Sequence, residues 1–353
     1  MIHLLQDANF RPAIYSPGLA SAISSCEVPA DFLPIGRRWN PRCYRNVIAT
    51  GKVQGAYATV QTRLFATNTL RHMHPGDIAI VYESAPLTSR WFDAGFQNAL
   101  VREDVRYIPV FPDAWPLSES WLRQCCRRRV ELATSVGCVT PGLVELFHST
   151  FPGKRFLLLE EPVPVNRFAP DWSEEKEIPT ICWSGPPHKI DEVVQMLPVL
   201  ESVARKTPFR LRIISGSNRP GLETTIPLEW LPFDDIDYQS RFAGVDIAFA
   251  CYRDSPYSAC KGNYKIKTYM AAGCAIVTSP IGYNLDLIHF GKNGLFASTA
   301  AEWEAAFLRL LRNPEERLVM RRAARDTAIR RFSYDAIARQ YAQVLRRNGL
   351  IGS

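Results

Sequence analysis

The run Val245–Cys251 constrains the fold most, because it is apolar at almost every position. A continuous apolar run of this length is typical of a parallel strand that helices cover on both faces. Shorter strand-like runs lie on either side of it along the chain, at Thr180–Trp183, Phe209–Ile214, Trp230–Phe233 and Ala275–Thr278. Alternating strands and helices predict a doubly wound α/β domain, which binds ligands beyond the carboxyl ends of its strands.

Three helices are predicted between these strands. The first follows an apolar stripe from Ile190 to Ala204, in which Pro198 is expected to kink or divide the helix. The second opens with a cap at Asp234-Asp235, and the third runs from about Tyr264 to Ala272 and stops at Gly273. Further helices are predicted from there to the end of the chain.

The N-terminal half shows the same alternation less clearly. Its strand-like runs are Val47–Ala49, Asp77–Tyr82, Val105–Phe111 and Phe156–Leu159. The segment Glu119–Leu132 has a helical pattern, and another helix is expected after Thr140, with Pro141 at its first position. The first forty residues give no assignment.

A hinge is predicted at 161–177, which carries three prolines followed by a short acidic run. We therefore expect an N-terminal domain over residues 1–165, a linker over 166–178 and a C-terminal domain over 179–333. The last segment, 334–353, is expected to be a helix that can pack back on the N-terminal domain.

Composition argues for a globular protein of the cytoplasm. The chain is 46% hydrophobic and 22% charged, and it has no apolar run of the roughly 18 residues that a spanning helix needs. Its start does not have the features of a signal peptide. Nine cysteines without a Cys-x-x-Cys pair predict reduced, mostly buried thiols rather than disulfides or a zinc site.

The net charge of +7 includes local arginine clusters, at Arg123 with Arg127–Arg129 and along 309–347. Acidic residues are interleaved with the second cluster, so both are interpreted as solvated helix faces. A peripheral site on the inner face of a membrane is the alternative that stays open. No aromatic stacking platform accompanies the arginines, so no nucleic-acid partner is expected.

Glycine-containing turns follow the C-terminal strands at the edge where a ligand is expected. In the turn from Ser184 to Lys189, Gly185 lets the backbone approach a phosphate, the helix N-terminus favours negative charge, and Lys189 can neutralise it. His188 lies in the same turn. The turns at Ser215-Gly216 and at Phe233 can hold a nucleotide base, although structural turns would look the same.

A fourth turn, 263–273, carries the most specific pattern. Lys265 lies on the first turn of the predicted helix, past the end of the Val245–Cys251 strand, so its cation is expected to face the same crevice as Gly185. Asn263, Tyr264 and Thr268 lie beside it in sequence. The small residues 271–273 allow this helix to pack closely before the chain re-enters the sheet.

The segment from Lys265 through Thr268 to Gly273, with the apolar strand after it, resembles the donor-site helix of GT-B glycosyltransferases. The resemblance is to the retaining class known as family 4, or glycosyl transferases group 1. It extends through Gly282, 286–288 and 291–296 to the closing pattern at 313–341, and so covers most of 179–345. It implies two Rossmann-like, doubly wound domains that face each other across a cleft.

The resemblance also implies an activity. The C-terminal domain would hold a nucleotide diphosphate sugar, and the N-terminal domain a glycan, lipid-linked or protein acceptor, as in polysaccharide biosynthesis. Lys265 and the Gly185 loop, helped by Lys189, would stabilise the departing diphosphate. Transfer of a hexose with retention, without a metal or another cofactor, is the implied reaction. Asp235 and Asp237 are interpreted as helix-capping residues rather than metal ligands.

The pattern departs from the family at two positions. Many relatives carry two glutamates eight residues apart, and the corresponding residues here are Cys260 and Thr268. Thr268 can still hydrogen-bond a hydroxyl, more weakly than a carboxylate would. In the N-terminal domain, Glu83 and Asp113 lie at strand ends and can act as bases or orient an acceptor, although capping residues and turn formers would occupy the same places.

Two alternatives to the transferase follow from these departures. One is a non-catalytic GT-B scaffold that binds a nucleotide, a sugar or a partner protein. The other is a nucleotide-sugar epimerase, because fold alone does not determine activity.

Overall fold

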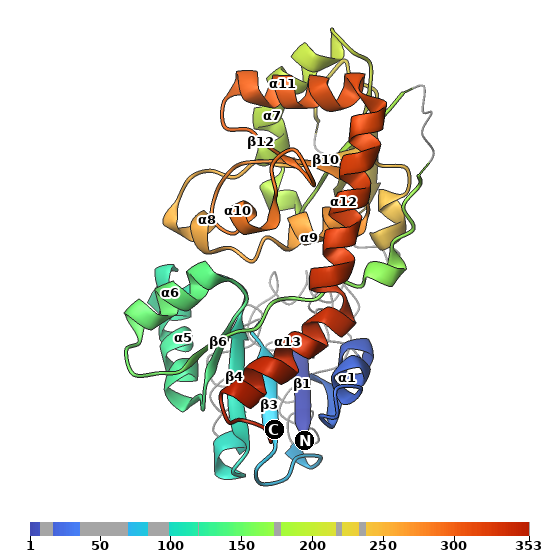
Figure 1. Cartoon of the computed structure of the whole chain (residues 1–353). Helices are drawn as coiled ribbons and strands as arrows, with labels where there is room; N and C mark the ends of the chain where they lie inside the picture. The colour runs from blue at the N-terminus through green and yellow to red at the C-terminus, as the bar shows by residue number, and fades with distance from the viewer. Residues whose placement is uncertain are drawn as a thin grey trace. The chain divides into compact units, whose positions relative to one another are not determined.

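The computed structural model of the chain describes residues 1–7, 17–35, 70–83, 99–118, 120–172, 178–216, 221–232 and 238–352 (Figure 1). These residues form two compact units. Unit 1 comprises Met1–Pro162, Cys260–Gly262 and Tyr334–Ser353, and unit 2 comprises Val163–Ala259 and Asn263–Ser333. The predicted strand Val47–Ala49, Phe233, and the capped helix opening at Asp234-Asp235 all lie outside the described residues.

Unit 1 is built on a six-stranded sheet in the order β2-β1-β3-β4-β5-β6, in which every pairing is parallel. Its strands are β1 Ile2–Asp7, β2 Ala30–Ile35, β3 Ile78–Tyr82, β4 Arg106–Phe111, β5 Val136–Cys138 and β6 Phe156–Leu158. Its helices are α1 Pro17–Ser24, α5 Ser120–Leu132, α6 Pro141–Thr150 and α13 Tyr334–Arg347, with a short 3-10 helix, η1, at Trp115–Leu117.

Two helices of unit 1, α5 and α6, begin where the sequence predicts them, whereas α1 was not predicted. Thr140 is extended and its side chain accepts a hydrogen bond from the Leu143 amide, while Pro141 occupies the first turn of α6, so this prediction is confirmed. The α5 prediction is also confirmed, within one residue at its start.

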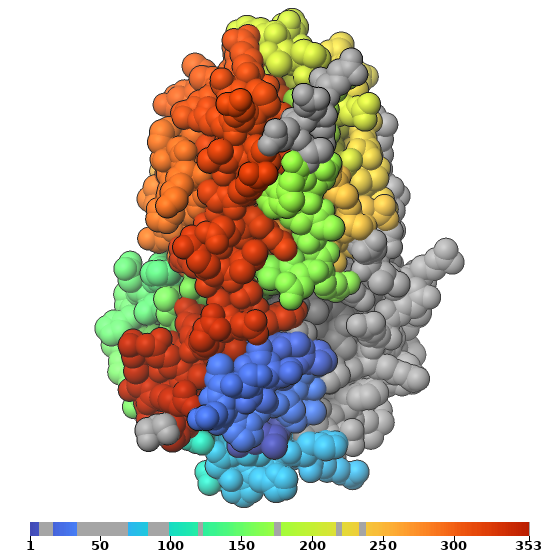
Figure 2. All heavy atoms as spheres, turned by 45° about the vertical axis from the view of Figure 1, so that its right-hand side comes forward, coloured from blue at the N-terminus to red at the C-terminus, as the bar shows by residue number. Residues whose placement is uncertain are grey.

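The C-terminal helix α13 belongs to unit 1 although the chain reaches it last. Ile337, Tyr341 and Leu345 on one of its faces are buried. The helix packs against α1, and both views show the two side by side (Figures 1 and 2). The segment after α13 is held by hydrogen bonds from Arg106 to the Leu350 carbonyl, 2.6 Å, and from the Arg155 guanidinium to a nearby backbone carbonyl, 2.7 Å.

Unit 2 has a second six-stranded sheet in the order β12-β11-β10-β7-β8-β9, again parallel throughout. Its strands are β7 Thr180–Ser184, β8 Arg210–Ser215, β9 Leu228–Pro232, β10 Ile247–Ala250, β11 Ala275–Thr278 and β12 Leu295–Phe296. Its α-helices are α7 Asp191–Ala204, α8 Pro256–Cys260, α9 Tyr264–Ala271, α10 Asn284–Leu287, α11 Ala300–Arg312 and α12 Pro314–Phe332. Its 3-10 helices are η2 Val165–Arg167, η3 Pro187–Lys189 and η4 Tyr238–Phe242.

Two details of unit 2 differ from the sequence-based prediction. The helix α7 is continuous through Pro198 rather than divided. Pro198 is exposed, so water can satisfy the carbonyl that its ring leaves without a helical donor. Strand β12 was not predicted, because a pair of residues is too short to show periodicity.

A buried ion pair holds α12 to the sheet of unit 2. Arg321 lies 3.2 Å from Asp246, and their side chains are only 3% and 2% exposed. The same guanidinium donates to the carbonyl of Gly273, 2.8 Å, at the turn that ends α9. Gly273 has a φ of 68°, and a Cβ there would also lie 2.9 Å from Trp172, so both conformation and space require glycine at this turn.

Among the described helices, none is long and apolar enough to cross a membrane.

Candidate functional site

The site follows from the strand order of unit 2. β7 is hydrogen-bonded to β8 on one side and to β10 on the other, so the order of the sheet reverses between β7 and β10. In open parallel sheets a ligand binds outside the carboxyl ends of the strands at this switch point. β7 ends at Ser184 and β10 ends at Ala250, and these ends define the candidate donor site.

Lys265 lies in a cluster of three side chains at this place. Its Nζ is 2.8 Å from Oε2 of Glu192 in the first turn of α7 and 4.5 Å from the ring centroid of Trp183 on β7. The indole Nε1 of Trp183 donates to the same Oε2, 3.0 Å. We call Trp183, Glu192 and Lys265 the Lys265 cluster. Its lysine and glutamate side chains are 16% and 20% exposed, so a ligand can still reach them.

Gly185 lies against this cluster. A Cβ at Gly185 would be 2.6 Å from two carbons of the Trp183 ring and 3.4 Å from Nζ of Lys265. Only glycine lets the chain pass so close to the indole and the ammonium. The structure therefore brings together Gly185 and Lys265, the two residues on which the sequence argument for a phosphate site depends.

The turn after Gly185 continues into η3, which holds His188 and Lys189 before α7 begins. The turn after β8 lies beside η3. A Cβ at Gly216 in this turn would overlap the ring of Pro187, the first residue of η3. The carbonyl of Gly216 accepts a hydrogen bond from the Trp230 indole, 2.8 Å. The Gly185 turn thus adjoins both the Gly216 turn and the turn that carries Lys265.

Three predicted binding residues carry buried polar atoms with no hydrogen-bond partner in the described part of the chain. These atoms are Oγ of Ser215 at the end of β8, Oδ1 of Asn263 and Oγ1 of Thr268. The Asn263 amide nitrogen donates to Asn284, 2.8 Å, which holds the residue in a left-handed conformation just before α9. Buried polar atoms without partners are uncommon, and a bound ligand is one way to satisfy them.

The remaining predicted residue of α9 is Tyr264, which is half-buried at the first position of the helix. Tyr269, one turn further on, accepts a hydrogen bond from the backbone amide of Ser184, 2.9 Å, and so fixes α9 to the end of β7. Burial raises the pKa of the Tyr269 hydroxyl well above its ordinary value, which keeps it protonated. Sequence reasoning did not single out Tyr269.

Glu192 and Trp183 were also missed. An acidic residue in the first turn of a helix is usually explained by the helix dipole, which gave no reason to place Glu192 near Lys265. Trp183 was included only as part of a predicted strand. The signal that could have indicated Glu192 was its position in the first turn of the helix that follows the Gly185 turn.

Cys260, which occupies one of the family's glutamate positions, is half-buried at the end of α8. Burial raises the pKa of its thiol, so the residue is a neutral group and not a substitute for a carboxylate.

In unit 1, Glu83 directly follows β3 and is buried in an ion pair. One carboxylate oxygen lies 2.6 Å from Nη1 of Arg129, and the other accepts from the Tyr107 hydroxyl, 2.5 Å. These contacts give Glu83 a structural role, and its action as a base stays a prediction. Asp113 lies in the turn before η1, where its carbonyl accepts from the Trp115 amide, 2.8 Å.

The interpretation of the arginine clusters as solvated helix faces is wrong for several members. Arg129, Arg317 and Arg321 are 4%, 5% and 2% exposed. Each has buried polar partners or an aromatic ring beside it, as with Arg129 over the Trp115 ring at 4.9 Å. Helical periodicity could not show this, because long basic side chains are normally placed on the polar face.

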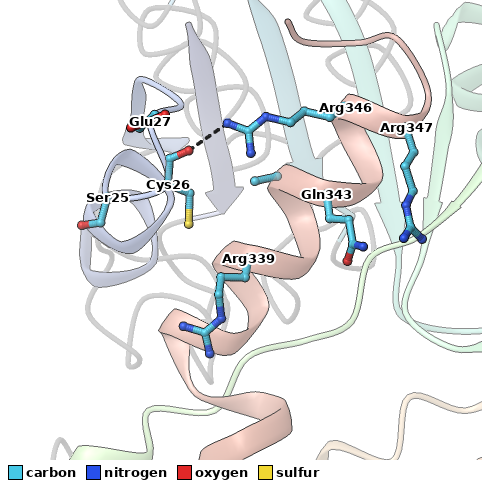
Figure 3. Close-up of a pocket in the computed structure, with 8 residues that line it drawn as sticks. Ser25, Cys26, Glu27, Arg339, Gln343, Arg346 and Arg347 are labelled. Atoms are coloured by element: carbon cyan, nitrogen blue, oxygen red, sulfur yellow. Dashed lines mark hydrogen bonds between the residues drawn. The ribbon is translucent and has the colours of Figure 1, made fainter. Parts of the chain in front are cut away.

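Other arginines line a pocket of about 420 Å³ between the end of α1 and α13 (Figure 3). Arg346 donates to the Cys26 carbonyl, 3.0 Å, just past the end of α1, which is a helix-capping contact. Glu27 lines the same pocket, and Arg347 points away from Arg346 in the close-up. The pocket has mixed charge and no convergent set of donors.

Two doubly wound sheets, with a glycine turn and a lysine at the switch point of the second, define the chain as a GT-B protein. Solved structures show the same fold. Sucrose-phosphate synthase from Thermosynechococcus elongatus matches with a TM-score of 0.68 and 13% identity, over 99% of this chain and 98% of that chain. A glycosyltransferase from Rickettsia africae ESF-5 matches with a TM-score of 0.66 and 12% identity, over 98% of each chain.

A third solved structure, of Anabaena HepE with UDP and glucose, matches with a TM-score of 0.63 and 13% identity, over 98% of this chain and all (100%) of that chain. The glycosyl transferase-like family matches residues 198–343. No curated protein matches the sequence. The solved structures therefore confirm the predicted GT-B fold.

Proposed function

We propose that the protein transfers a sugar from a nucleoside diphosphate donor to a glycan, lipid-linked or protein acceptor. Unit 2 holds the donor and unit 1 supplies the acceptor site. The reaction proceeds with retention and needs neither a metal nor another cofactor.

The observation that carries this proposal is the position of Lys265. Its ammonium lies at the switch point of unit 2, within 3.4 Å of where a Gly185 side chain would begin. When the glycosidic bond to the donor breaks, negative charge accumulates on the departing diphosphate. A fixed cation next to a glycine turn and the N-terminal end of a helix stabilises that charge, and Lys189 adds to it. Lys265 is therefore the proposed catalytic residue.

The other donor contacts are assigned by chemistry. The hydroxyl of Thr268 and the amide of Asn263 are suited to donor hydroxyl groups, with Tyr264 beside them. The nucleotide base is assigned to Ser215, Gly216 and Phe233. The edge of the diphosphate is assigned to His188. Because the HepE structures contain UDP and UDP-glucose, uridine nucleotides are the first donors to test.

For the acceptor side, Asp113 is the proposed base or acceptor-orienting residue. Glu83 is the second candidate for this role, although its carboxylate is held in an ion pair with Arg129.

A cytoplasmic protein that visits the inner face of a membrane would meet lipid-linked acceptors there. Vesicle sedimentation with anionic lipids tests this part separately.

The donor proposal is tested by calorimetric titration of nucleoside diphosphates into the wild-type chain and into Lys265→Ala. We expect one diphosphate to bind and the variant to lose roughly tenfold or more in affinity. The matched control is Lys292→Ala, which removes an equally charged, exposed lysine. If no diphosphate binds the wild type, the donor site is refuted.

Incubation with the corresponding nucleotide sugar distinguishes the activities. Slow hydrolysis, or transfer to an added glycan with retained anomeric configuration by NMR, supports the proposal. An epimerised sugar indicates an epimerase, and binding without turnover indicates a scaffold. Full activity in a chelator supports metal-independent transfer, and its loss contradicts that part.

A further inference from the structure

We propose that Glu192 is a fixed counter-ion that competes with the diphosphate for Lys265 and thereby promotes release of the nucleoside diphosphate product. This inference rests on the proposed function of the site. It assigns a role in affinity and turnover to a carboxylate that belongs neither to the family's two glutamate positions nor to the predicted site.

The first step is that Lys265 is already neutralised in the structure. Its Nζ lies 2.8 Å from the Glu192 carboxylate, so the pair has no net charge. A diphosphate that approaches the Lys265 ammonium therefore comes close to the Glu192 carboxylate, which already accepts a hydrogen bond from that ammonium. Two acceptors on one tetrahedral ammonium, each at that distance, lie only about 4.6 Å apart. At this separation two negative charges repel each other strongly, even near the protein surface.

The second step is that Glu192 is the less mobile partner. Its Oε2 also accepts the indole N–H of Trp183, 3.0 Å, and the Trp183 side chain is completely buried in β7. The carbonyl of Glu192 accepts from the thiol of Cys251 at the end of β10, 3.3 Å, which ties the first turn of α7 across the switch point. If the carboxylate moved away, a buried indole N–H would lose its partner. Lys265 has the long, flexible side chain, so it can turn toward a phosphate while Glu192 stays.

The third step compares donor and product. A nucleotide sugar has one ionisable oxygen on each phosphate, whereas the free diphosphate product has an additional ionisable oxygen on its terminal phosphate. The product is therefore the more negative of the two near neutral pH. Repulsion from a fixed carboxylate weakens product binding more than donor binding, so Glu192 favours exchange of product for fresh donor.

The test is titration of a nucleoside, its diphosphate and its nucleotide sugar into wild type and Glu192→Gln. The amide oxygen of glutamine can still accept from Trp183 and Lys265, and only the charge is lost. We expect the diphosphate to bind roughly tenfold more tightly, after allowance for the partial exposure of the pair, with a smaller gain for the nucleotide sugar and none for the nucleoside. Tenfold corresponds to about 1.4 kcal/mol. In turnover, the variant should show stronger inhibition by the diphosphate product.

The control is Glu201→Gln, which makes the same charge change on the same helix, roughly 14 Å further along the helix axis than Glu192. Should Glu192→Gln fail to fold, Trp183→Phe answers the same question. It keeps an aromatic ring over Lys265 but removes the indole N–H that holds the Glu192 carboxylate in place. The gain in affinity must again be largest for the diphosphate, smaller for the nucleotide sugar and absent for the nucleoside. Equal or weaker diphosphate binding by Glu192→Gln, with Lys265→Ala still impaired, overturns this inference and leaves the donor site intact. Absence of binding by the wild type instead refutes the proposed function.

Discussion

Replacing Gly185 by alanine tests whether the close approach of the glycine turn to the Lys265 cluster is essential. The added methyl would lie 2.6 Å from two ring carbons of Trp183. Ordinary carbon contacts begin near 3.4 Å, so the ring or the turn must move by close to an ångström. Trp183 is fully buried in the hydrophobic core of unit 2, so moving its ring displaces neighbouring core side chains.

The expected cost combines two effects. Overpacking of a filled core costs about 1–3 kcal/mol. Displacing the indole also weakens its hydrogen bond to Glu192, which contributes about 1 kcal/mol. We therefore expect a loss of about 2–4 kcal/mol in the free energy of unfolding, or a fall in Tm of about 4–16 °C for a domain of this size.

Differential scanning calorimetry, with titration of the diphosphate on the same samples, measures both consequences. Diphosphate affinity should fall together with Tm, because the turn that approaches the phosphate is displaced. Gly221→Ala is the matched control: a Cβ there meets nothing within 4 Å, so Tm should be unchanged. A Gly185→Ala protein with the wild-type Tm and the wild-type affinity would refute the packing described for this turn.

Four further substitutions test the two units. Arg321→Ala removes the guanidinium that pairs with the buried Asp246 carboxylate and should cost about 3–5 kcal/mol in thermal or urea unfolding, with partial rescue by lysine; a loss below 1 kcal/mol would contradict the buried pair. Thr299→Ala removes one half of the capping box of α11 and should cost about 1 kcal/mol. Backbone hydrogen bonds from Thr299 and Ser298 lower the pKa of Glu302, so its stabilising contribution is present above the usual value of 4.5 and is lost as pH falls through the lowered one; unchanged acid unfolding of Glu302→Gln would contradict this. Glu83→Gln should lower Tm by removing the negative charge that pairs with the buried Arg129 guanidinium, whereas a fall in kcat at constant Tm would instead identify Glu83 as a base.

The strands of unit 2 were predictable because helices cover both faces of the sheet. β7, β10 and β11 are buried at every position, so their sequences are nearly continuous apolar runs. Their limits differ from the prediction by up to two residues, since hydrogen bonding rather than hydrophobicity sets where a strand ends. β12 is too short to have a pattern.

The start of unit 1 was not predictable, because its first strand is buried without being a continuous apolar run. Strand β1 includes His3, which is completely buried. Its ring nitrogens lie 2.6 Å from Asp31 at the start of β2 and 3.0 Å from Asp77 just before β3. The partners that make a polar residue acceptable inside this sheet are far apart in sequence, so local hydrophobicity could not indicate a strand here.

The candidate donor site was likewise predictable only where the local sequence carries a signal. Gly185 and Lys265 were found from local signals, a strand followed by a glycine turn and a lysine at the start of a helix. The arrangement that neutralises Lys265 depends on which way the Glu192 and Trp183 side chains point, and that is determined by tertiary packing. The buried arginines were misassigned for the same reason, because their partners belong to other elements.

The path of the chain has a consequence for dissecting the protein. Because Tyr334–Ser353 belongs to unit 1, that unit is not a single uninterrupted stretch of sequence. A stop codon just before Tyr334 would leave the strands of unit 2 encoded in full, yet it would uncover α1 near the opposite end of the sequence. An isolated N-terminal half would therefore need its last helix restored, by a short linker after Pro162 or by co-expression of the helix as a separate peptide.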